Sequence, residues 1–87
     1  MSFELDFSNL AIEDLAYHKK IGNKAVSKKI AALLKEISEH PYTGTGKPEA
    51  LKHNLSGKWS RRINSEHRIV YTVLKDSVNI HSIKGHY

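Results

Sequence analysis

The sequence contains no cysteine and few of the features that mark special classes of protein. Without cysteine there is no disulfide framework, no thiolate zinc site and no cysteine nucleophile. The longest unbroken apolar run covers residues 30–34, whereas a membrane-spanning helix needs about 20 apolar residues. The first six residues include no basic segment and no apolar one, so we expect no signal peptide, no membrane association and a cytoplasmic location.

Carboxylates are scarce in the second half of the chain. Residues 47–87 contain three acids against eight bases, whereas residues 1–46 contain six of each, so the whole net charge of +5 lies in the second half. All three arginines lie there too, and a guanidinium matches pairs of phosphate oxygens. Such a basic surface with interspersed His, Trp and Tyr indicates nucleic-acid binding, although a solvated lysine-rich surface explains the composition equally well. Two-metal phosphodiester cleavage needs a carboxylate cluster, so we expect no metal and no cofactor.

At 87 residues the chain is long enough for one domain, residues 1–87. Residues 3–7 alternate apolar with acidic side chains, a pattern that predicts a half-buried strand. Ser8 or Asn9 can cap a helix over residues 10–21 that Gly22 ends, and Asn23 can cap a second helix that Pro41 ends. The expected apolar faces of the two helices are Ile12, Leu15 and Ala16 in the first, and Val26, Ile30, Leu33 and Ile37 in the second.

After a turn-rich segment at residues 42–48, the pattern changes to strands. We expect strands over residues 50–55, 58–63, 67–75 and 78–83. Residues 67–75 carry apolar side chains on both faces, including Tyr71, which is typical of a central strand. The predicted fold is α+β: an N-terminal strand, a helical hairpin, and then a four-stranded antiparallel meander with the helices packed on one sheet face.

Metal-free RNA cleavage needs three chemical groups, and the basic half supplies one of each type. The substrate's own 2′-hydroxyl is the nucleophile, so the protein must provide a base, a cation for the phosphorane and an acid for the 5′-oxygen. Glu49, Arg68 and His86 are candidates for these roles. The residues alone allow a simpler alternative, in which Glu49 pairs with a neighbouring lysine, Arg68 pairs with Glu66, and His86 lies in solvent.

Four stretches of the second half resemble the YoeB-type toxins of the RelE superfamily. They are residues 46–57 (GKPEALKHNLSG), residues 59–63 (WSRRI), residues 66–71 (EHRIVY) and the pair His86-Tyr87. The resemblance implies a RelE-like fold and a metal-independent mRNA interferase that cuts messenger RNA in the ribosomal A site. It assigns Glu49 as general base, Arg68 as the transition-state cation, His86 as general acid and Tyr87 as a residue that orients the substrate.

The same resemblance assigns an RNA-binding role to Lys52 and Arg62, and we expect the basic residues Arg61 and Lys84 to bind RNA as well. The partners it implies are a YefM-like antitoxin, the 70S ribosome and mRNA, and it leaves room for a homodimer. Two other functions stay open: a non-catalytic inhibitor that binds RNA or the ribosome, and a ParE-like gyrase poison. Of the remaining histidines, we expect His18 and His40 on helix surfaces and His53 and His67 in structural roles.

Overall fold

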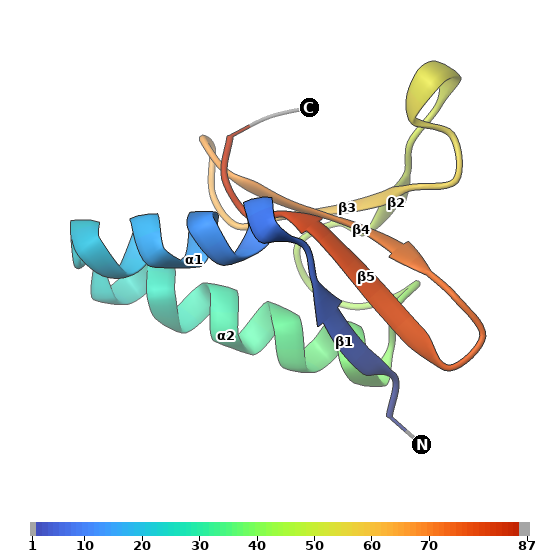
Figure 1. Ribbon diagram of the computed structural model, residues 1–87, viewed down its shortest axis with the longest axis horizontal. Helices are drawn as coiled ribbons and strands as arrows, with labels where there is room; N and C mark the ends of the chain where they lie inside the picture. The colour runs from blue at the N-terminus through green and yellow to red at the C-terminus, as the bar shows by residue number, and fades with distance from the viewer. Residues whose placement is uncertain (1, 86–87) are drawn as a thin grey trace.

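The computed structural model describes residues 2–85. Within this range, two helices and five strands follow one another, with one short 3₁₀ turn between the second and third strands (Figure 1). Among the described residues, no helix is both long and apolar enough to cross a membrane. The elements are β1 (Glu4–Phe7), α1 (Asn9–Ile21), α2 (Lys24–Glu39), β2 (Glu49–Ala50), η1 (His53–Leu55), β3 (Trp59–Arg62), β4 (Arg68–Val73) and β5 (Ser77–Ser82).

The strands form one sheet in the order β1-β5-β4-β3-β2. The pairs β2–β3, β3–β4 and β4–β5 are antiparallel, which confirms the predicted meander. Strand β1 lies at the far edge and pairs parallel with β5, with Glu4 opposite Ser77 and Phe7 opposite Ile80. Periodicity predicted this first strand but did not indicate its neighbour, because pairing between distant segments leaves no local pattern.

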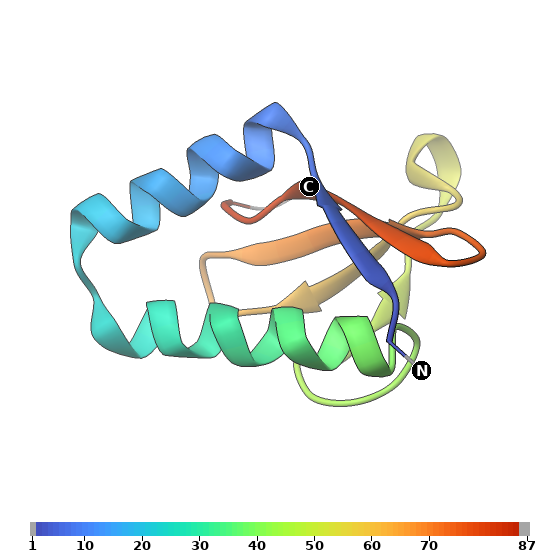
Figure 2. The ribbon, with the colours of Figure 1, turned by 60° about the horizontal axis from the view of Figure 1, so that its bottom comes forward.

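The helical hairpin forms as its capping residues predict. The Ser8 hydroxyl accepts a hydrogen bond from the Ala11 N–H at 3.0 Å, and the Asn23 side chain accepts one from the Val26 N–H at 3.1 Å. Between the helices, Gly22 takes a left-handed conformation with φ 75°, which lets the chain reverse. The two helices lie side by side and antiparallel on one side of the sheet (Figure 2).

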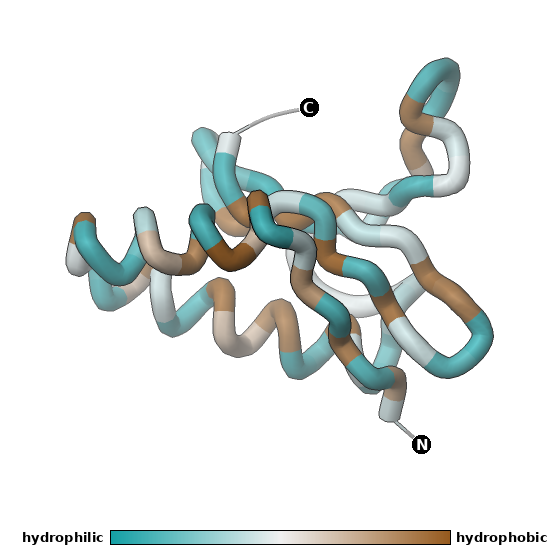
Figure 3. Tube along the Cα trace, in the orientation of Figure 1, coloured by the Kyte–Doolittle hydropathy of each residue, from teal (hydrophilic) through white to brown (hydrophobic). Residues whose placement is uncertain are grey.

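The core lies between this hairpin and one face of the sheet. On α2, Ile30, Leu33 and Ile37 are buried, as expected, and hydrophobic and hydrophilic segments alternate along the helix (Figure 3). They pack with side chains of the central strands, among them Tyr71, which is fully buried. Val26 is only partly buried but packs against the same cluster.

The apolar face predicted for α1 was confirmed only at Leu15, which is partly buried and packs against the core, and was wrong at Ile12 and Ala16, which are exposed. The buried residues of this helix are Ala11, Asp14 and His18, whereas Ile12 is 55% exposed. The rotation of the helix is set at its start, because the Ser8 hydroxyl also donates to the His81 carbonyl of β5 at 2.8 Å. That anchor turns two polar side chains toward the sheet.

The strand predicted over residues 50–55 was also wrong in most of its length. Strand β2 has only two residues, and the chain then makes the 3₁₀ turn η1. Local hydrogen bonds replace the sheet ladder there: the Leu55 N–H donates to the Lys52 carbonyl and the Ser56 N–H to the His53 carbonyl. The turn carries the chain away from the sheet (Figure 1).

Candidate active site

The strand register divides the side chains between two faces of the sheet. Tyr71 and Ile80 are register partners on the face that packs against the helices. On the opposite face, Glu49 of β2 lies across from Ser60 of β3, and Arg62 at the end of β3 lies across from Arg68 at the start of β4. Alternation along each strand therefore places Glu49 and Arg68 on the same face.

Glu49 and Arg68 form an ion pair on this face. The distance from Glu49 Oε1 to Arg68 Nη1 is 3.6 Å. The Glu49 side chain is 54% exposed and that of Arg68 is 16% exposed, so the carboxylate is open to solvent while the guanidinium is largely covered. This pairing replaces the alternative in which Arg68 pairs with Glu66 and Glu49 with a lysine. Two of the three groups required for metal-free cleavage therefore lie together.

Arg62 adds a second guanidinium to the same face. It is exposed, and its Cα is the register partner of the Arg68 Cα. Like charges directly opposite each other on neighbouring strands destabilise a sheet. Two guanidinium groups so placed become favourable when an anion binds to them, because a phosphate group neutralises the positive charge of each.

Lys52 lies in the segment that follows β2. It is exposed and lines a hollow of about 390 Å³ together with Glu49, His53 and Asn54. Ala50, Leu51 and Leu55 form the rest of the wall. The hollow thus has a carboxylate and an ammonium group on its lining.

Lys84 lies next to α1. It is exposed, and its Nζ lies 4.1 Å from the centre of the Tyr17 ring, a cation–π contact. The segment that contains Lys84 lies beside the start of β4. The Arg68 N–H donates a hydrogen bond to the carbonyl of Gly85, the residue after Lys84, at 3.1 Å.

Arg61 was wrongly expected to bind RNA. Its side chain is completely buried, on the opposite face of β3 from Arg62. The guanidinium donates to the Tyr71 hydroxyl and to Glu36. It also donates to the backbone carbonyls of His40, Thr43 and Thr45. Two adjacent arginines on a strand must point to opposite faces, so only one can reach solvent.

The Arg61 contacts fix the loop of residues 40–48 that leads into Glu49. Tyr71, whose pKa is raised by burial, donates its hydroxyl proton to the Pro41 carbonyl at 2.7 Å. Glu36 accepts hydrogen bonds from the backbone N–H and the hydroxyl of Thr45. The Thr45 N–H holds the pKa of Glu36 below its usual value of 4.5, and the Thr45 hydroxyl and Arg61 act in the same direction against burial.

Comparison with known proteins places the chain in a family. The model of the YoeB-like toxin of bacterial type II toxin-antitoxin systems matches residues 7–87. This chain belongs to the YoeB family. The toxin YoeB of Escherichia coli strain K12 is 46% identical over 84 residues, which cover 97% of this chain and 99% of that toxin.

Solved structures of the YoeB family agree with this assignment and with the RelE-like fold. A YoeB dimer from Staphylococcus aureus matches with a TM-score of 0.87 at 46% identity. A YoeB–YefM complex from the same organism matches with a TM-score of 0.85 at 48% identity. Each match covers the full length of both chains. The chain is therefore a toxin of a type II toxin–antitoxin system, as the resemblance implied.

His86 and Tyr87, to which the YoeB resemblance assigns the remaining catalytic roles, lie outside the described residues. The segment just before them is well anchored. The Ile83 N–H donates to Asp14 and the Ile83 carbonyl accepts from His18, each at 2.8 Å. The Gly85 N–H donates to Nδ1 of His67 at 2.9 Å.

Sequence reasoning missed the role of Asp14 and misplaced His18. His18 is buried rather than on the helix surface, whereas His67 has the structural role expected of it. The available signal was the spacing of Asp14 and His18, which lie four residues apart and so share one face of a helix. Burial lowers the pKa of another histidine, His81, and the nearby Lys58 adds to the effect.

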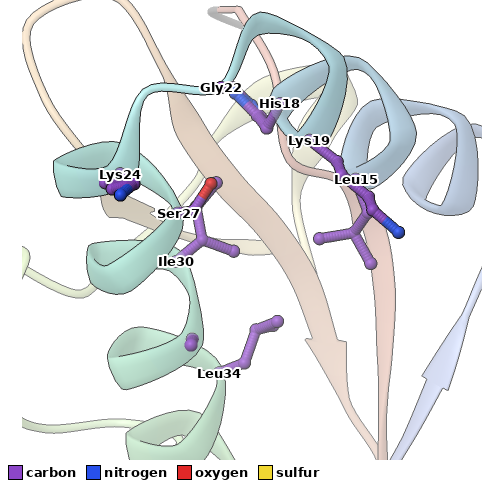
Figure 4. Close-up of a pocket in the computed structure, with 9 residues that line it drawn as sticks. Leu15, His18, Lys19, Gly22, Lys24, Ser27, Ile30 and Leu34 are labelled. Atoms are coloured by element: carbon purple, nitrogen blue, oxygen red, sulfur yellow. The ribbon is translucent and has the colours of Figure 1, made fainter.

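A groove of about 470 Å³ runs between α1 and α2, on the side of the molecule that carries the helices (Figure 4). Its lining is mostly apolar, with Leu15, Ile30 and Leu34, and lysines lie at its rim. His18 contributes to the groove and also contacts the Ile83 carbonyl. Glu49 and Arg68 do not line this groove.

Proposed function

We propose that this toxin is a metal-independent endoribonuclease that cleaves mRNA in the ribosomal A site. The single observation that supports the proposal is the ion pair of Glu49 and Arg68 on the open face of the sheet. A base and a cation for phosphate chemistry come together there from positions that are distant in the sequence. Lys52 and Arg62, both exposed nearby, supply further positive charge.

The reaction divides between these groups as follows. Glu49 accepts the proton of the ribose 2′-hydroxyl, whose oxygen attacks the adjacent phosphorus. Arg68 neutralises the charge that develops on the phosphorane oxygens. The bond between phosphorus and the 5′-oxygen breaks, and His86 donates a proton to that oxygen. The products are a 2′,3′-cyclic phosphate and a 5′-hydroxyl, and Tyr87 orients the substrate.

Arg62 and Lys52 hold the RNA backbone on either side of the scissile phosphate. The exposed Arg62 guanidinium can bind a phosphate in a bidentate manner. Lys52 acts as a point charge at the wall of the hollow that it shares with Glu49. Lys84 extends the basic surface along the segment beside β4.

The partner of the toxin is a YefM-like antitoxin, as in the Staphylococcus aureus YoeB–YefM complex. The second half of the chain carries all of the net positive charge, so the antitoxin segment that covers the open sheet face should be acidic. A homodimer of the toxin without antitoxin has a precedent in the YoeB dimer from the same organism.

Mapping of mRNA ends with and without ribosomes tests the proposal. Cuts should fall within translated codons only when ribosomes are present, and the new ends should carry a 2′,3′-cyclic phosphate and a 5′-hydroxyl. Glu49→Gln should abolish cleavage while keeping the shape of the side chain, and Glu66→Gln is the matched control at an exposed glutamate.

The other functions predict different outcomes. A non-catalytic inhibitor would stop translation without cutting mRNA, and its activity would survive Glu49→Gln but not the loss of Lys52 and Arg62. A gyrase poison would damage DNA and leave messages intact. New ends with 5′-phosphates would contradict attack by the 2′-hydroxyl.

A further inference from the structure

Two buried polar side chains of α1 form an unusual contact with the segment that precedes His86. Asp14 and His18 are 6% and 5% exposed, and they occupy positions of the helix that face the sheet. Burial of a carboxylate and an imidazole carries a desolvation cost, and apolar side chains of similar size would fill the same space at less cost. Their presence therefore calls for a role other than core packing.

Both side chains bind the backbone of one residue, Ile83. The Asp14 carboxylate accepts from the Ile83 N–H, and Nε2 of His18 must donate to the Ile83 carbonyl, because a carbonyl oxygen only accepts. The side chain of Ile83 is itself fully buried in the core. The two hydrogen bonds and the buried side chain therefore fix both the position and the orientation of the backbone at Ile83.

A second anchor follows two residues later. The Gly85 N–H donates to Nδ1 of His67, and the Gly85 carbonyl accepts from the N–H of Arg68. The two anchors are in contact, because the rings of His18 and His67 lie 4.9 Å apart in an edge-to-face arrangement. The chain is thus held on both sides of Lys84, immediately before His86 and immediately beside Arg68.

We propose that Asp14, His18 and His67 form a C-terminal clamp that positions His86 for proton donation to the leaving 5′-oxygen. None of the three touches the substrate; they are positioning residues that act through residues 83–85. This inference rests on the proposed function, since it assumes that His86 is the general acid. The clamp holds Gly85, whose carbonyl accepts a hydrogen bond from the N–H of Arg68, the transition-state cation of the proposed reaction.

The clamp predicts a defect in turnover rather than in RNA binding. In Asp14→Leu and His67→Phe, the acceptors for the Ile83 and Gly85 N–H groups are removed, while the volume of each side chain is approximately kept. We expect kcat to fall about 100-fold, the loss that follows from small misplacement of a catalytic group. KM should stay within about twofold, because Lys52 and Arg62 still hold the phosphates. His18→Gln keeps a donor and should retain most of the activity.

A substrate with a sulfur atom in place of the bridging 5′-oxygen shows whether a clamp variant loses activity because His86 is misplaced or because the protein is misfolded. Thiolate leaves without protonation, so cleavage of this linkage in a ribosome-bound mRNA does not need a general acid. The Asp14→Leu and His67→Phe enzymes should cleave it at nearly the wild-type rate, as should His86→Ala, whereas Glu49→Gln should stay inactive. Glu13→Leu, a change at an exposed neighbour on α1, is the control and should behave as wild type on both substrates.

The outcomes distinguish the clamp from the proposed function. If the sulfur linkage restores His86→Ala but neither Asp14→Leu nor His67→Phe, the clamp is wrong and the general acid stands. If it does not restore His86→Ala, the assigned role of His86 fails, and the clamp fails with it. Wild-type kcat on the ordinary substrate in both clamp variants would also overturn the inference. His67 is only partly buried, so we expect His67→Phe to fold. This variant therefore tests the clamp even if Asp14→Leu does not fold.

Discussion

Two adjacent arginines on β3 have opposite roles because a strand alternates its side chains between two faces. Arg62 meets solvent beside Arg68, whereas Arg61 is buried and binds the backbone of the loop before Glu49. Sequence alone identifies both residues as basic, and the resemblance to the YoeB family covers both. Only the register decides which of them is exposed to solvent.

Because Arg61 is buried and Arg62 is exposed, the substitutions Arg61→Lys and Arg62→Lys should change the free energy of unfolding by very different amounts. Lysine cannot reproduce the several hydrogen bonds of the Arg61 guanidinium, so the carbonyls of His40 and Thr43 lose their partner. We expect Arg61→Lys to lower the free energy of unfolding by about 3 kcal/mol. Arg62→Lys, at an exposed site, should change it by less than about 0.5 kcal/mol. Urea denaturation of the two variants measures the difference, and equal values would contradict the buried role of Arg61.

Two glycines offer a second matched comparison. Gly44 has φ 124°, and an added Cβ would lie 1.6 Å from Oε1 of Glu36, whose side chain is held by Arg61 and Thr45. Gly22 has φ 75°, but nothing lies within 4 Å of its Cβ position. Gly22→Ala should cost about 1 kcal/mol from backbone strain alone, and Gly44→Ala clearly more. Thermal unfolding followed by circular dichroism measures both, and a smaller cost at Gly44 would contradict the fixed position of Glu36.

Among the secondary structure elements, α2 and the loop of residues 40–48 are joined through Glu36. This carboxylate has a lowered pKa, so the folded protein binds its proton less readily than the unfolded chain does. The stabilising contribution is complete above the unfolded value of 4.5 and is lost as the pH falls through the lower folded pKa. The loop that leads into Glu49 should loosen in acid for this reason.

A comparison with Glu36→Gln isolates this effect from the titration of other acids. At pH 7 the wild-type protein should be more stable than the variant, because glutamine lacks the charge that Arg61 and Thr45 bind. The difference should shrink below pH 4.5, where Glu36 begins to take up a proton in the unfolded chain. Urea denaturation at a series of pH values measures it, and a constant difference between pH 7 and pH 3 would be inconsistent with the assignment.

The sequence predicted those elements whose pattern is local. The capping residues Ser8 and Asn23, the turn at Gly22 and the apolar face of α2 all depend on near neighbours, and all were confirmed. The inward face of α1 depends on a hydrogen bond from Ser8 to β5, far along the chain, and of the apolar residues predicted there only Leu15 packs against the core. The same reason applies to the site: residue types indicated Glu49 and Arg68, but the clamp residues gain their role only from the packing of α1 against residues 83–85.

At the level of the whole molecule, the charge is divided between two sides. The open sheet face carries Arg62 and Arg68, and Lys52 lies beside it, whereas the helical side carries the apolar groove with its lysine rim. An RNA backbone on the sheet face would displace counterions, so its binding should weaken with salt.

The salt dependence offers a prediction for the intact toxin on ribosomes. The logarithm of the association constant should fall linearly with the logarithm of the salt concentration. The double variant Lys52→Ala and Arg62→Ala should reduce the slope by about 2, because two phosphate contacts are lost. The pair Lys28→Ala and Lys29→Ala, on α2, is the control for loss of the same charge elsewhere. Equal effects of the two pairs would indicate a diffuse attraction instead of a site on the sheet.

The parallel pairing of β1 with β5 has a consequence for how the toxin is made. Strand β1 is synthesised well before β5, the strand with which it pairs, and α1 well before Ile83, whose N–H binds Asp14. Contacts between such distant segments form late, since the intervening chain must first be ordered. A nascent copy therefore lacks the completed sheet, and the anchoring of Ile83 by Asp14, until β5 and Ile83 have been synthesised. That delay gives an antitoxin time to meet a chain that is not yet fully folded.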